Sequence, residues 1–164
     1  MNNALISDCG EYRYWLTREF ENELNFIPCG VVFIMLNPST ADADKDDATI
    51  RRCISFAKGF GFNSLVVVNA YGYRATKPVD LWKVSEPVGP DNDEWIKRIV
   101  SDHETVIVAW GGNAKINRIK HVHRLLKQTP TKIMCLGTTK NGDPRHPLYV
   151  KSSQILTPWE LNHE

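Results

Sequence analysis

The sequence has almost no net charge and no long hydrophobic segment. Its 164 residues include 20 Lys and Arg against 19 Asp and Glu, which leaves a formal charge of +1. A protein that coats polyanions through bulk positive charge is therefore excluded, although a local basic face is not. The longest strongly apolar run, Val31 to Leu36, is far shorter than the roughly 20 residues that cross a bilayer. No secretory signal is visible at the start, so we expect a cytoplasmic protein with no membrane association.

Cysteine motifs are also missing. The four cysteines, Cys9, Cys29, Cys53 and Cys135, are widely separated, with no CxxC pair and no histidine at zinc-finger spacing. Two of them, Cys53 and Cys135, fall inside apolar patterns, which favours buried reduced thiols over a metal or iron–sulfur site. We therefore expect neither a metal nor another cofactor.

The sequence does contain a regular alternation of two patterns, and its length suits a single domain over residues 1–164. Continuous apolar runs are typical of parallel strands covered on both faces, and they occupy 30–36, 64–69, 105–110 and 132–136. Helical patterns lie between them, at 48–60, from Asp91 or Asp93 to Val100, and at about 114–128. This order predicts an α/β three-layer sandwich with a mainly parallel central sheet flanked by helices. The segment Tyr12 to Leu16 alternates and predicts an antiparallel edge strand or a hairpin.

Unusual polar segments follow all four predicted strands. They read LNPSTAD, NAYGYRAT, WGGNA and KNGDPRHPLY in chain order. In open α/β sheets, ligands bind in the crevice beyond the carboxyl ends of the strands. The sequence therefore predicts a pocket at that edge, lined by these four segments.

The first segment places an amide at a strand end. Pro38 biases Asn37 towards an extended conformation, so that its side chain can accept a hydrogen bond from a water and donate to a substrate carbonyl. The next residues, Ser39 and Thr40, offer backbone N–H groups suited to an oxyanion or a phosphate. The alternative is an ordinary Asn-Pro turn.

The second segment places another amide at the next strand end. Asn69 offers a donor and an acceptor that match the edge of a pyrimidine. Tyr71 and Tyr73 are candidates to stack on a base, and Arg74 to hold a phosphate. The alternative is a strand cap with tyrosines packed on the rim.

The segment GDPRHPLY holds a histidine between Arg145 and Pro147. With its backbone restricted by prolines, His146 is placed to donate to a leaving group or to act as an acid or base near neutral pH. Leu148 and Tyr149 are bulky residues on the same loop and suit a wedge inserted into a base stack. The alternative is a surface loop with a capping histidine.

Charged residues gather in two further segments. Asp46 and Asp47 begin the helical pattern at 48–60, where one carboxylate is explained as an N-cap and the other is a candidate general base or metal ligand. A run without acids covers 114–132 and includes Lys115, Arg118, Lys120 and Arg124. It predicts either a solvated helical face or one that contacts the phosphates of DNA or a nucleotide.

Five segments together resemble a family of bacterial and phage proteins, the domain of unknown function numbered 1643. They are FIMLNPSTADA, DDATIRRC, VVNAYGYRAT, VGPDND and GDPRHPLYV, and they cover nearly the whole chain in order. The family name itself implies no activity.

The order of motifs is also similar to that of the uracil-DNA glycosylase superfamily, through Leu36-Asn37-Pro38-Ser39, Val68-Asn69-Ala70, Ala109-Trp110-Gly111 and His146-Pro147-Leu148. The resemblance implies a glycosylase-like fold in which Asn37 orients the attacking water, Asn69 reads the base and His146 stabilises the departing base. The sequence departs from the pattern where Met35 replaces a glycine and where no serine follows His146-Pro147.

Three hypotheses about function remain open. The first is an enzyme that hydrolyses the N-glycosidic bond of a base, ordinary or modified, in DNA or in a nucleotide. Its catalytic residues would be Asn37, Asp47 and His146, and its substrate-binding residues would be Pro38, Ser39, Asn69, Tyr71, Tyr73, Arg74, Gly111, Arg145 and Leu148. The second is a non-catalytic nucleic-acid or nucleotide-binding module of the same fold. The third is a metal-assisted phosphoesterase that uses Asp46, Asp47 and His146. We expect a monomer in each case.

Overall fold

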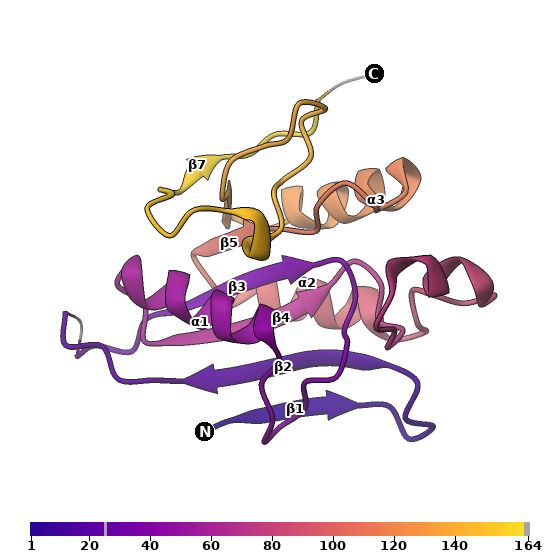
Figure 1. Cartoon of the computed structure of the whole chain (residues 1–164), viewed down its shortest axis with the longest axis horizontal. Helices are drawn as coiled ribbons and strands as arrows, with labels where there is room; N and C mark the ends of the chain where they lie inside the picture. Colours follow the sequence, from indigo (N-terminus) through magenta and orange to yellow (C-terminus); the bar gives the residue numbers. More distant parts are fainter. Residues whose placement is uncertain (25, 163–164) are drawn as a thin grey trace.

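A seven-stranded mixed β-sheet forms the centre of the computed structural model, which describes residues 1–24 and 26–162 (Figure 1). The strand order is β1-β2-β4-β3-β5-β6-β7. The strands are β1 Asn3–Ile6, β2 Arg13–Glu19, β3 Gly30–Met35, β4 Ser64–Asn69, β5 Thr105–Val108, β6 Lys132–Cys135 and β7 Thr157–Pro158. Neighbours within β4-β3-β5-β6 are parallel, whereas β1, β2 and β7 pair in antiparallel fashion. The α/β class is confirmed, but the sheet is mixed rather than mainly parallel.

The antiparallel strands explain that difference. The segment Tyr12 to Leu16 largely falls in β2, which forms a hairpin with β1 and lies between β1 and β4. The hairpin alternative is therefore confirmed, and the edge position belongs to β1. Neither β1, with four residues, nor β7, with two, is long enough to give a clear hydrophobic pattern in the sequence.

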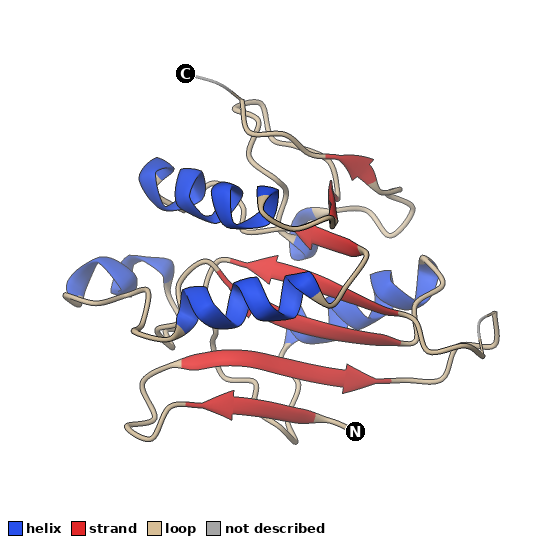
Figure 2. Cartoon of the chain, turned by 180° about the vertical axis from the view of Figure 1, so that it is seen from behind, coloured by secondary structure: helices blue, strands red, loops and turns tan. Residues whose placement is uncertain are grey.

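Helices cover both faces of the sheet and give three layers. Helix α1 (Ala48–Gly59) lies on one face, and α2 (Asn92–Ser101) and α3 (Ile116–Lys127) lie on the other (Figures 1 and 2). Two short 3-10 helices follow strand-end loops, η1 (Pro78–Lys83) and η2 (Pro147–Tyr149). Within residues 1–24 and 26–162, no helix combines the length and apolar character needed to span a bilayer.

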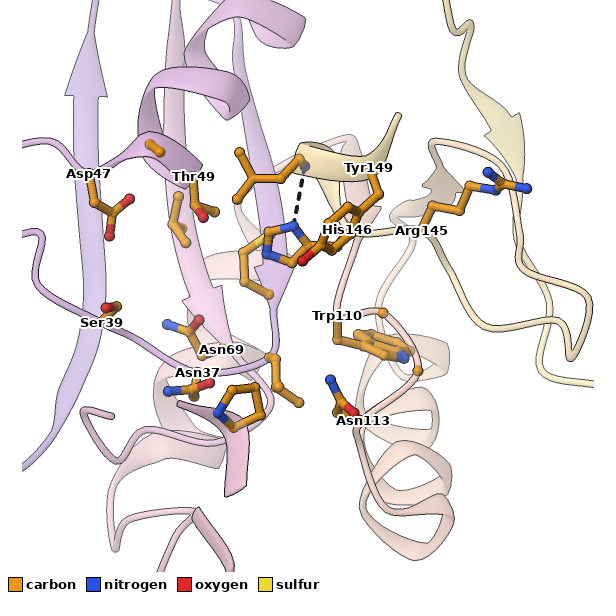
Figure 3. Close-up of a pocket in the computed structure, with 18 of the residues that line it drawn as sticks. Asn37, Ser39, Asp47, Thr49, Asn69, Trp110, Asn113, Arg145, His146 and Tyr149 are labelled. Carbon is orange, nitrogen blue, oxygen red and sulfur yellow. Dashed lines mark hydrogen bonds between the residues drawn. The ribbon is translucent and has the colours of Figure 1, made fainter. Parts of the chain in front are cut away.

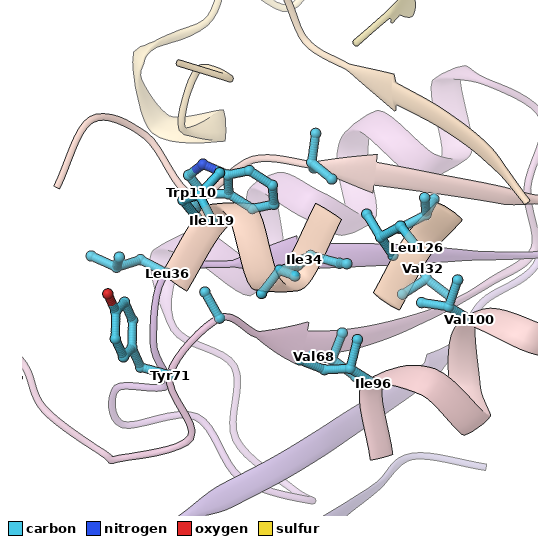
Figure 4. Close-up of a cluster of buried hydrophobic side chains, with 14 of the residues drawn as sticks. Val32, Ile34, Leu36, Val68, Tyr71, Ile96, Val100, Trp110, Ile119 and Leu126 are labelled. Atoms are coloured by element: carbon cyan, nitrogen blue, oxygen red, sulfur yellow. The ribbon is translucent and has the colours of Figure 1, made fainter. Parts of the chain in front are cut away.

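The central strands are apolar throughout because each face packs against helices. Along β3, Val32 and Ile34 point into the cluster formed with α2 and α3, which Figure 4 shows, and Phe33 and Met35 point towards α1. All four side chains are at most 3% exposed. Burying a side chain of this size contributes about 1.5–3 kcal/mol. The continuous pattern in the sequence therefore reflects burial on two sides.

The capping residues predicted from the sequence are found at the start of α1 but not at the start of α2. Asp47 caps α1, because its carboxylate accepts the Ile50 N–H at 2.9 Å. At the start of α2, however, the Asp91 side chain makes no capping hydrogen bond, and Asp93 instead pairs with residues of α3. All four cysteines are free, and burial raises the pKa of the Cys53 thiol. Cys135 is also buried, as its apolar pattern predicts.

The order of the parallel strands places a crevice at one edge. From β3 the chain passes through α1 to β4, and then through α2 to β5 on the opposite side of β3. The strand order therefore reverses between β3 and β5, and such a switch point opens a crevice outside the carboxyl ends of the strands. The loops that follow β3, β4, β5 and β6 all begin at this edge, because these strands are parallel.

Candidate functional site

A cavity of about 630 Å³ lies at this edge, bounded by the strand-end loops, the start of α1 and the η2 loop (Figure 3). Its volume falls within the range of roughly 300–1,000 Å³ that is usual for small-molecule sites. Many of the residues singled out from the sequence line it, namely Asn37, Ser39, Asp47, Asn69, Gly111, Arg145, His146 and Leu148. Loops that are distant in sequence therefore contribute to one site.

The Asn37 side chain has a fixed orientation. Its Nδ2 donates to the carbonyl oxygens of Pro38 at 2.9 Å and Ala75 at 2.8 Å. Because both partners are acceptors, the amide nitrogen must face them and Oδ1 is the atom left for a ligand. Asn37 can therefore accept a hydrogen bond from a water in the cavity. The expectation that its nitrogen donates to a substrate is wrong, since both N–H groups are already used.

The amide nitrogen of Asn69, unlike that of Asn37, is left without a partner among the described residues. The residue is only 1% exposed, and its Nδ2 has no hydrogen-bond partner within residues 1–24 and 26–162. The main-chain carbonyl of Asn69 accepts from Asn92 Nδ2 at 2.9 Å, which fixes this end of β4. Leaving a buried amide donor unpaired costs about 1–3 kcal/mol. Since Asn69 lines the cavity, an acceptor on a bound ligand would satisfy it.

His146 is held as a neutral hydrogen-bond donor. Its Nδ1 accepts the N–H of Leu148 at 3.2 Å, so the proton of the neutral ring resides on Nε2. Burial lowers the pKa of His146, and the Asp47 carboxylate only partly opposes this shift. At neutral pH the ring therefore offers an Nε2–H donor without carrying a charge.

Titration of this ring provides a first prediction. A histidine pKa lowered in the folded protein means that folding favours the neutral ring, so this contribution to stability is present above the unfolded value of about 6.5 and is lost as the pH falls. We expect ¹⁵N NMR to show an unprotonated Nδ1 at pH 7 and a midpoint for His146 below 6.5. A midpoint above that value, or a proton on Nδ1, would contradict this assignment.

The loop that carries His146 is fixed to its neighbours. Arg52 of α1 donates to the Pro147 carbonyl at 3.3 Å, to the Val150 carbonyl and to Ser152 Oγ at 2.9 Å. From the other side, the N–H of Gly111 donates to the Pro144 carbonyl at 2.9 Å. These contacts hold the histidine in place over the cavity.

Two bulky side chains stand at the rim of the cavity. Leu148 is 45% exposed and Tyr149 is 80% exposed, and both belong to η2. The Tyr149 ring centroid lies 5.7 Å from that of His146. Their exposure leaves them accessible to whatever approaches the opening.

The acidic segment is mostly structural. Asp46 pairs with Arg18 Nε at 2.7 Å and does not line the cavity, and the carbonyls of Asp42 and Lys45 also accept from Arg18. Backbone N–H groups of Asp44 and Lys45 hold the pKa of the Asp42 carboxyl below its usual value. Only Asp47 of this segment lines the cavity.

The ligand set Asp46, Asp47 and His146, suggested for a metal-assisted phosphoesterase, is therefore not assembled, because Asp46 is held by Arg18. Over the described part of the chain, no group of three or more His, Cys, Asp or Glu side chains is placed to hold a metal ion.

Four predicted binding residues do not line the cavity: Pro38, Tyr71, Tyr73 and Arg74. Tyr71 is 3% exposed within the core, and its hydroxyl accepts the N–H of Lys115 at 3.1 Å. Tyr73 packs edge-on against Tyr12, and Arg74 points towards the Gly10 carbonyl. The expectation that the two rings stack on a base in this cavity is therefore wrong.

The basic helix is less available for phosphates than its sequence indicates. Arg118 donates to the Ala70 carbonyl at 2.6 Å and pairs with Asp93 at 2.6 Å, so its side chain is only 9% exposed. The ammonium group of Lys115 lies 4.5 Å from the centre of the Trp82 ring. Lys120 and Arg124 remain exposed, but on the sheet face opposite α1. A phosphate-binding role for α3 stays a prediction, without Arg118.

Several residues that line the cavity were not selected from the sequence as site residues, and Trp110 and Arg13 are the two with the largest polar or aromatic groups. Trp110 forms part of the cavity wall, although only its place in a strand-end motif had been noted. Arg13 also reaches the cavity from β2 while being only 2% exposed. The sequence feature that could have identified Arg13 is its place in the alternating segment Tyr12 to Leu16. An arginine is common on an exposed edge strand, but burying its charge inside a sheet costs free energy.

Comparison with known proteins gives one match. A family described as "Protein of unknown function (DUF1643)" matches residues 13–148. No curated protein and no solved structure matches the chain. The match supports the resemblance to this family over residues 13–148, whereas the resemblance to uracil-DNA glycosylases stays a prediction.

Proposed function

Because the chain belongs to the DUF1643 family of proteins of unknown function, we propose its activity from the cavity itself: hydrolysis of the N-glycosidic bond of a base in DNA or in a nucleotide. One observation carries the proposal. Asn37 after β3, Asn69 at the end of β4 and His146 after β6 line the same cavity (Figure 3). They supply a water acceptor, an unpaired amide donor and a neutral N–H donor.

The cavity suits an extruded base. Its volume of about 630 Å³ accommodates one planar ring together with its sugar. The unpaired Nδ2 of Asn69 would bind an acceptor on the ring edge, and Trp110 supplies an aromatic wall. Leu148 and Tyr149 at the rim would fill the space that the base leaves in the stack.

The reaction can be written with groups of this chain. The bond between sugar C1′ and the base nitrogen breaks, and its electron pair leaves with the base. The Nε2–H of His146 donates a hydrogen bond to the oxygen on which this negative charge develops, an effect that acts strongly in a site shielded from water. The base leaves as an anion and takes a proton from solvent.

Water then completes the hydrolysis at C1′. Asn37 Oδ1 accepts a hydrogen bond from this water and directs its lone pair towards the sugar. Asp47 has one oxygen on the Ile50 N–H, and its second oxygen is available to take the proton that the water loses. The new C–O bond replaces the broken C–N bond, so atoms and charges balance.

Base release from defined substrates tests the proposal. The full chain is incubated with single- and double-stranded oligonucleotides and with mononucleotides that hold uracil, hypermodified pyrimidines or mismatches. Free base is detected by mass spectrometry and abasic sites by alkaline cleavage, with and without a chelator. We expect base release that the chelator does not affect.

The other two hypotheses predict different results. Salt-dependent DNA binding with no base release across the panel would favour a non-catalytic binding module. Chelator-sensitive release of phosphate would favour a phosphoesterase. Either result would contradict the glycosidic reaction.

A further inference from the structure

Arg13 carries a buried positive charge without a carboxylate partner. Its side chain is 2% exposed, and no ion pair within residues 1–24 and 26–162 includes it. One nitrogen, Nη1, donates to the Ala41 carbonyl at 2.7 Å, whereas Nε is buried with no hydrogen-bond partner in the same residues. A buried guanidinium in this condition is costly unless something else neutralises it.

Arg18 shows what a structural arginine on the same strand requires. It is equally buried, at 2% exposed, but its Nε pairs with Asp46 and its other nitrogens donate to backbone carbonyls. All three nitrogens of the Arg18 guanidinium therefore donate to acceptors of this chain. Arg13 has one such bond and faces the cavity instead.

The nearby carboxylates do not neutralise Arg13. Asp47 and Asp42 act on it only through longer-range attraction, and Arg74 and Arg18 oppose them. The Asp47 carboxylate caps α1, and that of Asp42 holds the backbone of its own turn. Loss of hydration dominates, and it lowers the pKa of Arg13 to about 10.

The surroundings of Arg13 in the cavity are rich in donors. A guanidinium has only donors, so no change of tautomer or rotation could turn it into an acceptor. The buried Nδ2 of Asn69 in the same cavity is also unpaired. The first turn of α1, a helix of 12 residues, lines the cavity too and adds the positive end of its dipole. The Asp47 carboxylate also lines the cavity and opposes an anion, and against it these donors together favour a negatively charged occupant.

We propose that Arg13 binds an anionic oxygen group of the substrate, a carboxylate or a phosphate, inside the cavity. This inference rests on the proposed function for the ring and adds a substrate class, namely a base or nucleotide with a charged substituent that reaches Arg13. The planar fork of arginine suits both anions, because it makes two parallel hydrogen bonds. The charge has two possible sources, an acidic group on the base or the 5′-phosphate of a free nucleotide.

Binding measurements with matched ligand pairs test this proposal. Isothermal titration calorimetry on the full chain compares uracil with 5-carboxyuracil, and deoxyuridine with its 5′-monophosphate. We expect the charged member of one pair to bind at least tenfold more tightly, and that pair identifies the source of the charge. Arg13→Gln should abolish the preference, and Arg13→Lys should retain only part of it. The exposed Arg98 of α2 provides the control, since Arg98→Gln should leave the preference unchanged.

Equal binding of both members in each pair, or no binding of either, would overturn the proposal, and so would a preference that survives in Arg13→Gln. Thermal melting shows whether Arg13→Gln folds. If it does not fold, the charge preference of the wild type and of Arg13→Lys decides whether the anion site exists.

Base release is measured separately from binding. Release from uncharged substrates that Arg13→Gln leaves unchanged would uphold the glycosidic reaction and reject the anion site. If Arg13→Gln loses the charge preference and the wild type releases no base, the anion site would be upheld and the glycosidic reaction rejected.

Discussion

Replacing His146 with alanine is expected to slow base release by about 10²–10³-fold, the usual effect of removing one donor from a developing oxyanion. The expectation follows from the Nε2–H donor that the hydrogen bond between Nδ1 and Leu148 fixes in place. The loop itself should survive the substitution, because Arg52 and Gly111 hold its backbone. Single-turnover kinetics on the best substrate of the panel would measure the effect.

Two further variants separate chemistry from folding. His146→Gln keeps a neutral donor and should recover part of the rate. His121 lies on α3, where it pairs with Asp93 outside the cavity, so His121→Gln should change the rate by less than about twofold if chemistry is confined to the cavity. An unchanged rate in His146→Ala would remove this histidine from the mechanism.

Asn37→Ala is expected to lower the rate by about 10²-fold, the cost of a poorly placed reactant. The variant removes the acceptor for the attacking water and also the two hydrogen bonds to the Pro38 and Ala75 carbonyls. We therefore expect kcat to fall more than KM rises, together with some loss of thermal stability. Asn117→Ala, at an exposed position on α3, is the matched control.

A near-isosteric variant distinguishes the two functions of Asn37. In Asn37→Asp a carboxylate would face two carbonyl oxygens, to which it cannot donate. We expect a lower melting temperature and poor rescue of the rate. A rate equal to that of the wild type in Asn37→Ala would show that this side chain does not position the water.

The sequence is most informative where burial is uniform. Both faces of β3 and β5 are covered, so their apolar runs predicted parallel strands and located the edge of the sheet at which the following loops begin. That edge is where Asn37, Asn69 and His146 meet. The placement of these three residues could thus be predicted from chain order and topology alone.

Side-chain direction beyond a strand end could not be predicted in this way. After Asn69 the N–H groups of Ala70 and Tyr71 both donate to the same neighbouring segment, to the carbonyls of Met35 at the end of β3 and of Leu36 directly after it. A regular strand directs only every second N–H to the same neighbour, so the alternation of faces ends there. Tyr71 consequently turns into the core between the sheet and α3 rather than into the cavity.

Long-range partners were the other missing information. Arg118 looked available for phosphates because its own helix has no acids, yet Asp93 on α2 binds it. Arg13 looked ordinary because its strand was expected at an edge or in a hairpin, whereas β2 lies inside the sheet and the Arg13 side chain is buried against the Ala41 carbonyl. In both cases a contact far away in sequence decides whether the charge is free.

An NMR footprint of ligand binding tests directly whether the cavity at the carboxyl edge of the sheet binds a base. The full chain, labelled with ¹⁵N, is titrated with the pyrimidine 5′-monophosphates dUMP, dTMP and dCMP. We predict that at least one of them shifts the side-chain amide of Asn69 and the ring nitrogens of His146 most strongly, because both groups line the cavity. Shifts confined to the exposed face of α3, around Lys120 and Arg124, with the cavity unaffected, would contradict a base-binding site at the carboxyl edge of the sheet.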